Sequence, residues 1–353
     1  MRPSIRAALL LLPLMAAGVA WWWIGQGPSR IGASKAEVLQ CALPAQAADN
    51  KHPGMVWVPT GSFDLGDAVY PEEGPLRRVK LDGFWMDRTE VTNEQFGQFV
   101  KATGYVTVAE RDVDPKLHPG LPPEMRQPGA VVFVSPTAAG GTGQEGASAT
   151  QWWRYLPGAQ WRHPGGPRTS IEGRGAFPVV AITFEDALTY AKWKGRSLPS
   201  EAQWEWAARA AQATAQSQGA AMREQPKQAN TWQGLFPVLN SGEDGFVGLA
   251  PVGCYAPNAL GLFDMIGNVW ELTMDAWTPD HAALPVGPAG TNADPATPPP
   301  RPGAPLQRVI KGGSHLCAPN WCMRYRSGAR QAQDEDLAVS HLGFRTVLNA
   351  PGP

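Results

Sequence analysis

The spacing of apolar and polar positions predicts where the folded part of the chain begins. Residues 54–66 alternate between apolar and polar side chains and close with turn-forming residues, which indicates a strand and a hairpin. Residues 79–87 form a second apolar run that is typical of another strand region. The folded domain is therefore predicted to start near residue 51 with β structure.

Three helices are predicted from one recurring start signal. A hydroxyl residue stands three positions before an amide or acidic residue in Thr92-Asn-Glu-Gln95, Thr183-Phe-Glu-Asp186 and Ser200-Glu-Ala-Gln203, the pattern of a capping box. Apolar stripes follow each start, and the helices are expected to end near residues 101, 194 and 210.

Long stretches without a period separate these elements. Residues 136–150 and 278–305 are predicted to be surface loops or insertions. The 353 residues include 39 Gly and 35 Pro, about a fifth of the chain, which favours loops over long helices. Short helices on a loop-rich body with scattered strands predict one α+β domain over residues 51–349.

The first 50 residues have a different character. Arg2 and Arg6 precede an uncharged stretch, so residues 1–24 are predicted to be a signal peptide or a membrane anchor. The aromatic run at 21–23 suits a membrane interface, and either reading places the domain outside the cytoplasm. Residues 25–50 are interpreted as a linker, and Cys41 as a thiol within it.

Charge and short motifs exclude some classes of function. The net charge of −1 provides no basic surface for nucleic acid. The chain contains no Gly-rich phosphate loop and no dinucleotide fingerprint.

Cys317 and Cys322 are the strongest candidates for chemistry. They stand five residues apart in a segment broken by Gly312, Gly313 and Pro319, so their thiols can converge on one point. A structural disulfide, a soft metal site and a redox pair are all compatible with this spacing. Zinc is disfavoured because no second CxxC or histidine pair completes four ligands.

The surroundings of this pair resemble the formylglycine-generating enzymes, the sulfatase-modifying oxidases that convert a cysteine of a client sulfatase into formylglycine. The resemblance rests on residues 311–326, on Ser-Gly-Ala-Arg at 327–330 and on His-Leu-Gly-Phe-Arg at 341–345, and it extends over residues 54–347. It implies a C-type-lectin-like fold with little regular secondary structure.

The resemblance also implies a mechanism. Cys317 and Cys322 match the catalytic pair of the family, which uses Cu(I), O₂ and a thiol reductant on an unfolded sulfatase polypeptide with a Cys-x-Pro-x-Arg motif. Thiolates favour Cu(I), which accepts few ligands and leaves room for a substrate thiolate. Ser314 matches the active-site serine, Trp321 an aromatic beside the second cysteine, and Trp270 an aromatic placed against the oxygen pocket.

Two groups of oxygen ligands match the calcium sites of the family. Ca²⁺ takes six to eight oxygens from carboxylates, amides and backbone carbonyls. From the residues alone, ordinary turn-forming Asp and Asn are the favoured explanation of these segments. The resemblance implies a first site from Asn230, Thr231, Asp244 and Phe246, and a second site from Asp264, Gly267, Val269 and Glu271, where Asp264 replaces a commoner Asn.

Four arginines and two absent cysteines complete the pattern. Arg345 is expected to brace the body by pairing with a carboxylate, whereas Arg324, Arg326 and Arg330 could brace it or line a peptide groove. Ser327 and Thr346 occupy positions of family disulfides, and Cys254 has no evident partner. The predicted scaffold therefore lacks disulfides, which favours a functional role for the cysteine pair.

Other functions remain open on the sequence. A non-catalytic lectin-like adaptor is possible because a fold does not fix a function. Another oxidase on the same scaffold is the third class, either an iron-dependent sulfoxide synthase or a periplasmic siderophore-maturation protein. The synthases need a histidine-rich iron site, and the six histidines form no close-spaced cluster.

Overall fold

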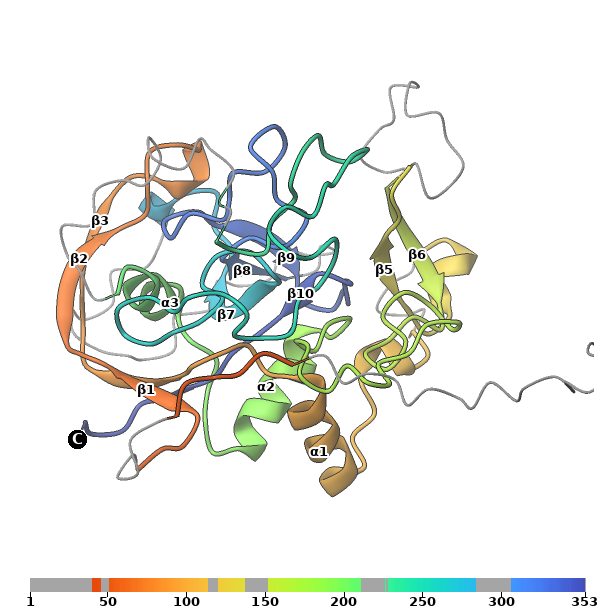
Figure 1. The fold of residues 1–353 in the computed structure, drawn as a ribbon, viewed down its shortest axis with the longest axis horizontal. Coiled ribbons are helices and arrows are strands. Elements are labelled where there is room, and N and C mark those ends of the chain that lie inside the picture. Colours follow the sequence, from red (N-terminus) through yellow and green to blue (C-terminus); the bar gives the residue numbers. More distant parts are fainter. Residues whose placement is uncertain are drawn as a thin grey trace, which may run out of the picture. The chain divides into compact units, whose positions relative to one another are not determined.

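The computed structural model describes residues 40–45, 51–113, 120–136, 152–210, 226, 228–283 and 306–352. Residues 38–353 form one compact unit with few helices and several small sheets, as expected for a single loop-rich α+β domain (Figure 1). The predicted export segment at 1–24, most of the linker and most of the two predicted loops lie outside the described residues. Within the described part, no helix has the length and apolar character needed to cross a bilayer.

The three predicted helices are confirmed, together with their capping boxes. Thr92, Thr183 and Ser200 each accept the backbone N–H three residues later, and that residue's side chain accepts their own N–H. The helical elements of the described residues are α1 Asn93–Thr103, α2 Phe184–Trp193 and α3 Glu201–Ala208, with short 3-10 turns η1 Pro71–Glu73, η2 Val108–Glu110, η3 Pro123–Arg126 and η6 His281–Ala283.

The strands of the described residues form four small sheets. The largest has the order β10-β7-β8-β9, from Leu342–Gly343, Trp270–Ala276, Gln307–Lys311 and Gln331–Asp334. A three-stranded sheet has the order β1-β4-β11, from Met55–Val58, Phe84–Asp87 and Val347–Leu348. Two-stranded sheets pair β2 Gly61–Leu65 with β3 Arg77–Leu81, and β5 Gly129–Phe133 with β6 Trp153–Pro157.

The hairpin predicted within residues 54–66 is wrong. Strands β1 and β2 do form there, but β1 pairs with β4 (Val56 opposite Met86) and β2 pairs with β3 (Phe63 opposite Val79). The apolar region at 79–87 is likewise divided between β3 and β4 at Gly83, whose N–H donates to Thr60. Buried β4 becomes a central strand between β1 and β11. A local alternation pattern identifies a strand and leaves its partner undetermined.

Two apolar clusters fill most of the core. One combines residues of α1, α2, β7 and β10 with Cys317, Cys322 and Tyr325. The other joins β2, β3 and β4 to α3, with Phe63 stacked on Trp206. The segment that carries the cysteine pair is therefore part of the main core.

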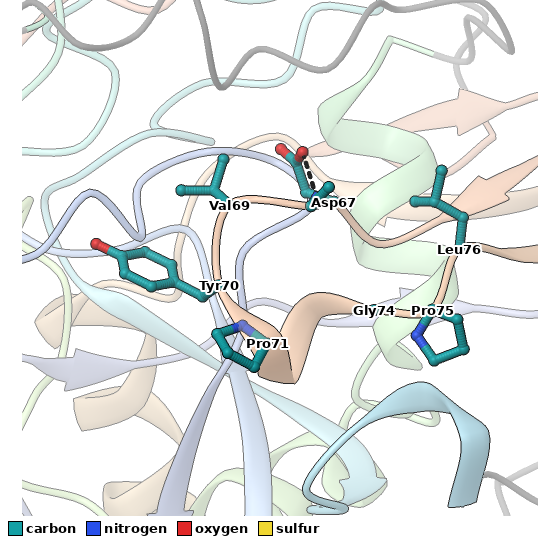
Figure 2. Close-up of a pocket in the computed structure, with 8 residues that line it drawn as sticks. Asp67, Val69, Tyr70, Pro71, Gly74, Pro75 and Leu76 are labelled. Carbon is teal, nitrogen blue, oxygen red and sulfur yellow. Dashed lines mark hydrogen bonds between the residues drawn. The ribbon is translucent and has the colours of Figure 1, made fainter.

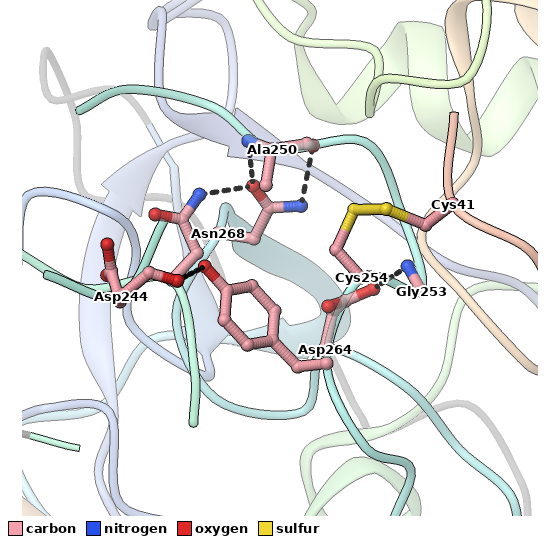
Figure 3. The surroundings of a disulfide bond; sticks show 9 residues. Cys41, Asp244, Ala250, Gly253, Cys254, Asp264 and Asn268 are labelled. Carbon is pink, nitrogen blue, oxygen red and sulfur yellow. Dashed lines mark hydrogen bonds between the residues drawn. A yellow bond between two sulfur atoms is a disulfide. The ribbon is translucent and has the colours of Figure 1, made fainter. Parts of the chain in front are cut away.

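Cys41 and Cys254 form a disulfide, which corrects two predictions from the sequence (Figure 3). Cys41 is not a free linker thiol, and Cys254 does have a partner. Residues 40–45 are further attached by Arg88, which donates to the carbonyl of Pro44, and by Leu43, which packs directly on Gly253. This part of the predicted linker thus belongs to the domain, and the scaffold does contain a disulfide.

We expect this bridge to stabilise the domain. Replacing Cys41 and Cys254 together by serine should lower the free energy of unfolding by about 2–4 kcal/mol, because the bridge joins residues 213 positions apart in the unfolded chain. Chemical denaturation in non-reducing buffer measures this. Reductant should bring the wild type to the stability of the double variant and leave the double variant unchanged; equal stabilities without reductant would contradict the expectation.

Candidate functional site

A tight turn after β8 brings the two cysteines together. Strand β8 ends at Lys311, and Gly312 and Gly313 follow with positive φ angles of 90° and 70°. A side chain at Gly313 would lie 2.9 Å from the Cα of Tyr325, so only glycine allows the two ends of the segment this close approach. We call residues 312–326 the cysteine loop.

The two sulfur atoms of the cysteine loop meet without a covalent bond. Cys317 Sγ and Cys322 Sγ lie 2.7 Å apart, compared with about 2.05 Å in a disulfide. Both side chains are buried in the core. The Cys322 N–H donates to the carbonyl of Ala318 and the Cys317 N–H to that of Ser314, which fixes the turn between them. The predicted convergence of the thiols is therefore confirmed.

The two thiols differ in their affinity for a proton. Burial raises the pKa of Cys317 well above its usual value. A hydrogen bond from Cys317 lowers the pKa of Cys322, with further help from Arg324. Cys322 is therefore the thiol of the pair that loses its proton more readily, and the thiolate is the form that attacks or binds a metal.

Arg324 connects the pair to a loop far away in the sequence. Its Nε and Nη2 atoms lie 3.1 and 2.5 Å from Glu72 Oε1, and its guanidinium covers the ring of Tyr70 at 4.1 Å. Tyr70 also lines a hollow of about 340 Å³ together with Pro71, Pro75 and Leu76 (Figure 2). The sequence analysis missed Glu72 and Tyr70, because no local pattern relates them to residues 250 positions later.

The other candidates from the sequence occupy different surroundings. Ser314 is buried at the start of the turn, where its hydroxyl accepts the N–H of Leu316. Trp270 is buried in the same core cluster as both cysteines. Trp321 is 47% exposed and stacks on Phe236 with ring centroids 5.5 Å apart. Ser314 and Trp321 thus belong to the cysteine loop, and Trp270 shares the core cluster of the two cysteines.

Two histidines belong to this region: half-buried His315 lies within the cysteine loop, and His341 is buried. His315 Nδ1 lies 2.9 Å from the carbonyl oxygen of Asn268. Burial lowers the pKa of His315 to about 4, and burial together with His315 lowers the pKa of His341 to about 3. Both imidazoles are therefore neutral at pH 7.

The first predicted calcium site gathers its residues around Asp244. Asp244 Oδ2 accepts the N–H of Thr231 at 2.9 Å, and its Oδ1 accepts that of Phe246 at 3.2 Å. Among the described residues, the buried Asn230 Oδ1 and Gln233 Oε1 have no hydrogen-bond partner. Buried oxygens without a donor are costly, and a cation would satisfy them.

The second predicted site is crowded with charge. Glu271 is bound by Arg345, whose Nε and Nη2 lie 2.6 and 2.7 Å from the two carboxylate oxygens, and by Trp204. Asp264 Oδ2 accepts the Gly253 N–H at 2.6 Å (Figure 3). Burial, with repulsion from these carboxylates, raises the pKa of Glu90 well above its usual value. Three carboxylates thus face one guanidinium.

Asn268 joins these two groups and was not singled out from the sequence. Its Oδ1 accepts a hydrogen bond from the Ala250 N–H at 3.0 Å (Figure 3). The same oxygen accepts one from Asn230 Nδ2 at 3.0 Å, and Asn268 Nδ2 donates to Glu90. Its φ angle is positive, at 54°, a conformation that Asn tolerates better than most residues. No grouping of three His, Cys, Asp or Glu suited to a metal ion is found in the described part of the chain.

Each of the four arginines singled out from the sequence pairs with a carboxylate. This confirms bracing for Arg345 and answers the question left open for the others. Besides Arg345 with Glu271, the pairs are Arg324 with Glu72, Arg326 with Asp67 and Glu73, and Arg330 with Glu201.

Helix α3 supplies the acids for a buried network below the loop. Lys311 Nζ lies 3.0 Å from Glu205, and Arg330 Nε lies 2.9 Å from Glu201. Burial alone would raise the pKa of Glu201, but Arg330, His281 and Lys311 lower it to about 2. Burial and repulsion from Glu201 raise the pKa of nearby Asp275 to about 7.

Known proteins resemble this chain over most of its length. The sulfatase-modifying factor enzyme 1-like domain matches residues 40–350. A formylglycine-generating enzyme of Mycobacterium tuberculosis is 45% identical over 306 residues, covering 84% of this chain and 97% of that protein. The formylglycine-generating enzyme of Thermomonospora curvata is 41% identical, covering 87% and 97% of the two chains.

Two further similarities extend the comparison. The mouse protein named inactive Cα-formylglycine-generating enzyme 2 is 33% identical, covering 87% of this chain and 90% of that protein. The structure of PvdO from Pseudomonas aeruginosa superposes with a TM-score of 0.53 at 23% identity, covering 83% and 93% of the chains. The structural similarity supports the predicted fold.

The buried network makes a prediction about pH. The folded-state pKa of Asp275, about 7, exceeds its unfolded value near 3.8. The folded protein therefore binds this proton more tightly between about pH 4 and pH 7, and Asp275 adds stability as the pH falls through that window.

Asp275→Asn should remove this contribution while keeping an acceptor for the Glu201 N–H, which lies 2.5 Å from Asp275 Oδ2. The difference in unfolding free energy between wild type and variant should change with pH by at most about 1.4 kcal/mol per unit. Denaturant titrations from pH 5 to pH 8 measure it, with exposed Asp82→Asn as control. A difference that is constant across this range would contradict the assignment.

Proposed function

The chain belongs to the formylglycine-generating enzyme (sulfatase-modifying factor) family, and on this premise we propose that it converts a cysteine of sulfatase polypeptides into formylglycine. The observation that carries the proposal is the buried, unbonded pair of Cys317 and Cys322, with sulfur atoms 2.7 Å apart. The client would carry the Cys-x-Pro-x-Arg motif in an unfolded segment.

The main alternative is a protein of this fold without catalytic activity. The similarity to a mouse protein named as inactive means that family membership alone does not select between these functions. A structural role for two cysteines would be served by a disulfide, and Cys41 and Cys254 form one. The unbonded state of Cys317 and Cys322 supports catalysis over an adaptor.

The proposed reaction needs an external reductant. Conversion of the –CH₂–SH group to an aldehyde, with the sulfur leaving as hydrogen sulfide and water balancing the oxygen, releases two electrons, whereas reduction of O₂ to water consumes four. A thiol reductant can supply the other two electrons. The oxidoreductase assignment therefore implies O₂ and a thiol as co-reactants.

Cys317 and Cys322 would hold Cu(I). Their soft sulfur donors and their shared burial suit this ion better than Zn²⁺ or Ca²⁺. No third protein side chain joins them as part of a metal-binding group in the described residues, which leaves a position for a substrate thiolate. When bound, Cu(I) would supply an open coordination position for that thiolate and a metal able to activate O₂.

Side chains around the pair have separate tasks in this proposal. Arg324, fixed by Glu72, stabilises the thiolate of Cys322. Buried Ser314 offers a hydroxyl at the start of the turn, and Trp270 forms an apolar wall that excludes water. Exposed Trp321 is placed to contact an incoming polypeptide.

Calcium would have a structural role. The partnerless Asn230 Oδ1 and the carboxylate of Asp244 support an ion at the first site, together with the carbonyls of Thr231 and Phe246. At the second site, a cation bound by Asp264, Glu271 and the carbonyls of Gly267 and Val269 would relieve the excess of carboxylates over Arg345; a shared proton is the competing solution.

The place of action follows from residues 1–24. We propose that the protein is exported, as a periplasmic or otherwise extracytoplasmic enzyme with possible attachment to the membrane through this segment. The disulfide between Cys41 and Cys254 supports an oxidising compartment. Formylglycine formed only in a reporter held in the cytoplasm would contradict this proposal.

The cysteine pair gives the test of function. The reduced protein should bind one Cu(I) per chain and form formylglycine on a Cys-x-Pro-x-Arg peptide with O₂ and a thiol, as detected by mass spectrometry. Cys317→Ser and Cys322→Ser should each weaken copper binding and reduce turnover by at least about 100-fold, because both thiolates are ligands. The C41S/C254S variant is the matched cysteine control and should keep both properties. Full activity of either single variant would exclude the mechanism.

Calcium can be tested through stability. Chelation should lower the melting temperature, since an ion that binds only the folded state adds about 2.7 kcal/mol at 100 times its dissociation constant. Asp244→Asn should remove most of this effect, and its exposed neighbour in Glu243→Gln should not. Calcium dependence that persists in Asp244→Asn and disappears after Asp264→Asn would assign an ion to the second site. A melting temperature insensitive to Ca²⁺ would exclude both.

A further inference from the structure

Exposed apolar side chains gather beside the cysteine loop. Eight large apolar side chains are exposed among the described residues, and four of them belong to this region: Leu235 at 57%, Leu239 at 62%, Val247 at 67% and Trp321 at 47%. Single exposed apolar residues are ordinary, whereas a group of them on one surface indicates an interaction site. We call these four residues the exposed patch.

Hydrogen bonds join the segment that carries the patch to the cysteine loop. The Trp232 N–H donates to the carbonyl of Cys317 at 3.0 Å. The Asn320 side chain accepts the Phe236 N–H at 3.5 Å and donates to the Phe236 carbonyl at 3.2 Å. Trp321, the residue before Cys322, stacks on Phe236. This contact connects Trp321 to the segment that carries the three aliphatic residues of the patch.

Local turns bring the three aliphatic residues together. The Leu239 N–H donates to the carbonyl of Leu235 at 2.9 Å, which closes a tight turn and keeps the two residues close to each other. Asn240 Nδ2 donates to the carbonyl of Val247 at 3.2 Å. Below them, Trp232 and Phe236 are buried in an aromatic cluster, so the patch has a rigid base.

We propose that the exposed patch binds apolar residues that flank the reactive cysteine in an unfolded client polypeptide. This inference rests on the proposed function, because it places the client next to Cys322. Unfolded chains expose Leu, Val and aromatic side chains that folding buries. A surface that binds them beside the active site selects clients before they fold.

A second copy of the chain fits this surface less well. A stable dimer interface uses about 20–30 residues on each side, and the patch has four. Weak, extended contact with a flexible segment needs far less area. The continuity with the cysteine loop also favours the molecule on which the cysteines act.

Binding of labelled 20-residue peptides to the full-length protein tests the proposal. Each probe carries Ser in place of the motif cysteine. In one pair of probes the residues before the motif are either Leu and Val or Ser and Gly, and in a second pair the residues after the motif are varied in the same way. The wild type should bind the peptide with the correct apolar flank about tenfold more tightly, as expected for burial of a few aliphatic side chains. The L235S/L239S/V247S variant should lose this preference, and Val106→Ser, which changes an exposed residue elsewhere, should keep it.

Further measurements separate the possible failures. Turnover of a five-residue motif peptide should be the same in the triple variant as in the wild type, which would also show that the variant folds. If the triple variant does not fold, the single variant Leu239→Ser replaces it. That variant should reduce the preference for the apolar flank about threefold. Formylglycine on the short peptide without any flank preference in the wild type would overturn the inference and leave the proposed function standing. A preference for the apolar flank without formylglycine on any peptide would overturn the proposed function and leave peptide binding by the patch standing. A patch-dependent change in molecular mass would assign the surface to a second copy and overturn the inference.

Discussion

Buried ion pairs hold the cysteine loop in place, and the arrangement of the candidate site depends on them. Lys311 and Arg330, at the two sides of the loop, both pair with acids of α3, and Arg326 pairs with Asp67 and Glu73. These groups are almost completely buried. Removing one partner of such a pair leaves an uncompensated charge and typically costs about 3–5 kcal/mol. A segment with no regular secondary structure is thereby fixed from both ends.

The fixed backbone of the cysteine loop also explains how the two thiols remain close to each other without a covalent bond. The loop backbone cannot relax freely, because Gly312 and Gly313 fit between Trp204 and Tyr325 with almost no spare room. Within this frame, the hydrogen bond from Cys317 stabilises the thiolate of Cys322. The pair is therefore held in one arrangement before any substrate arrives, as the proposed binding of a soft metal ion requires.

The molecule uses its four cysteines in two different ways, and position in the fold separates them. Cys41 and Cys254 join the amino-terminal segment to a turn next to Asp264, whereas Cys317 and Cys322 lie in the main core. Residues 230–247 precede Cys254 and carry Asn230 and Asp244 of the proposed first calcium site together with the aliphatic part of the exposed patch. Because the Trp232 N–H donates to the carbonyl of Cys317, the proposed ion site, the proposed client contact and the thiol pair are connected, and we expect a change in one to affect the others.

The sequence alone determined the features that depend on neighbours along the chain. Capping boxes located all three helices, because a cap bonds residues three positions apart. The spacing of Cys317 and Cys322 within a glycine-containing turn was enough to predict that their thiols meet. The motifs around them were enough to identify the family and to indicate the role of Arg345.

Only the tertiary structure decided the features that join distant segments. The pairing of β1 with β4, the disulfide of Cys41 with Cys254 and the contact of Arg324 with Glu72 cross large separations in sequence. The alternation pattern of a strand does not specify which strand it pairs with. The sequence around a single cysteine or arginine likewise does not specify its bonding partner. These pairings depend on the packing of the whole core, since burial of apolar surface and compensation of buried charge involve residues from all parts of the chain.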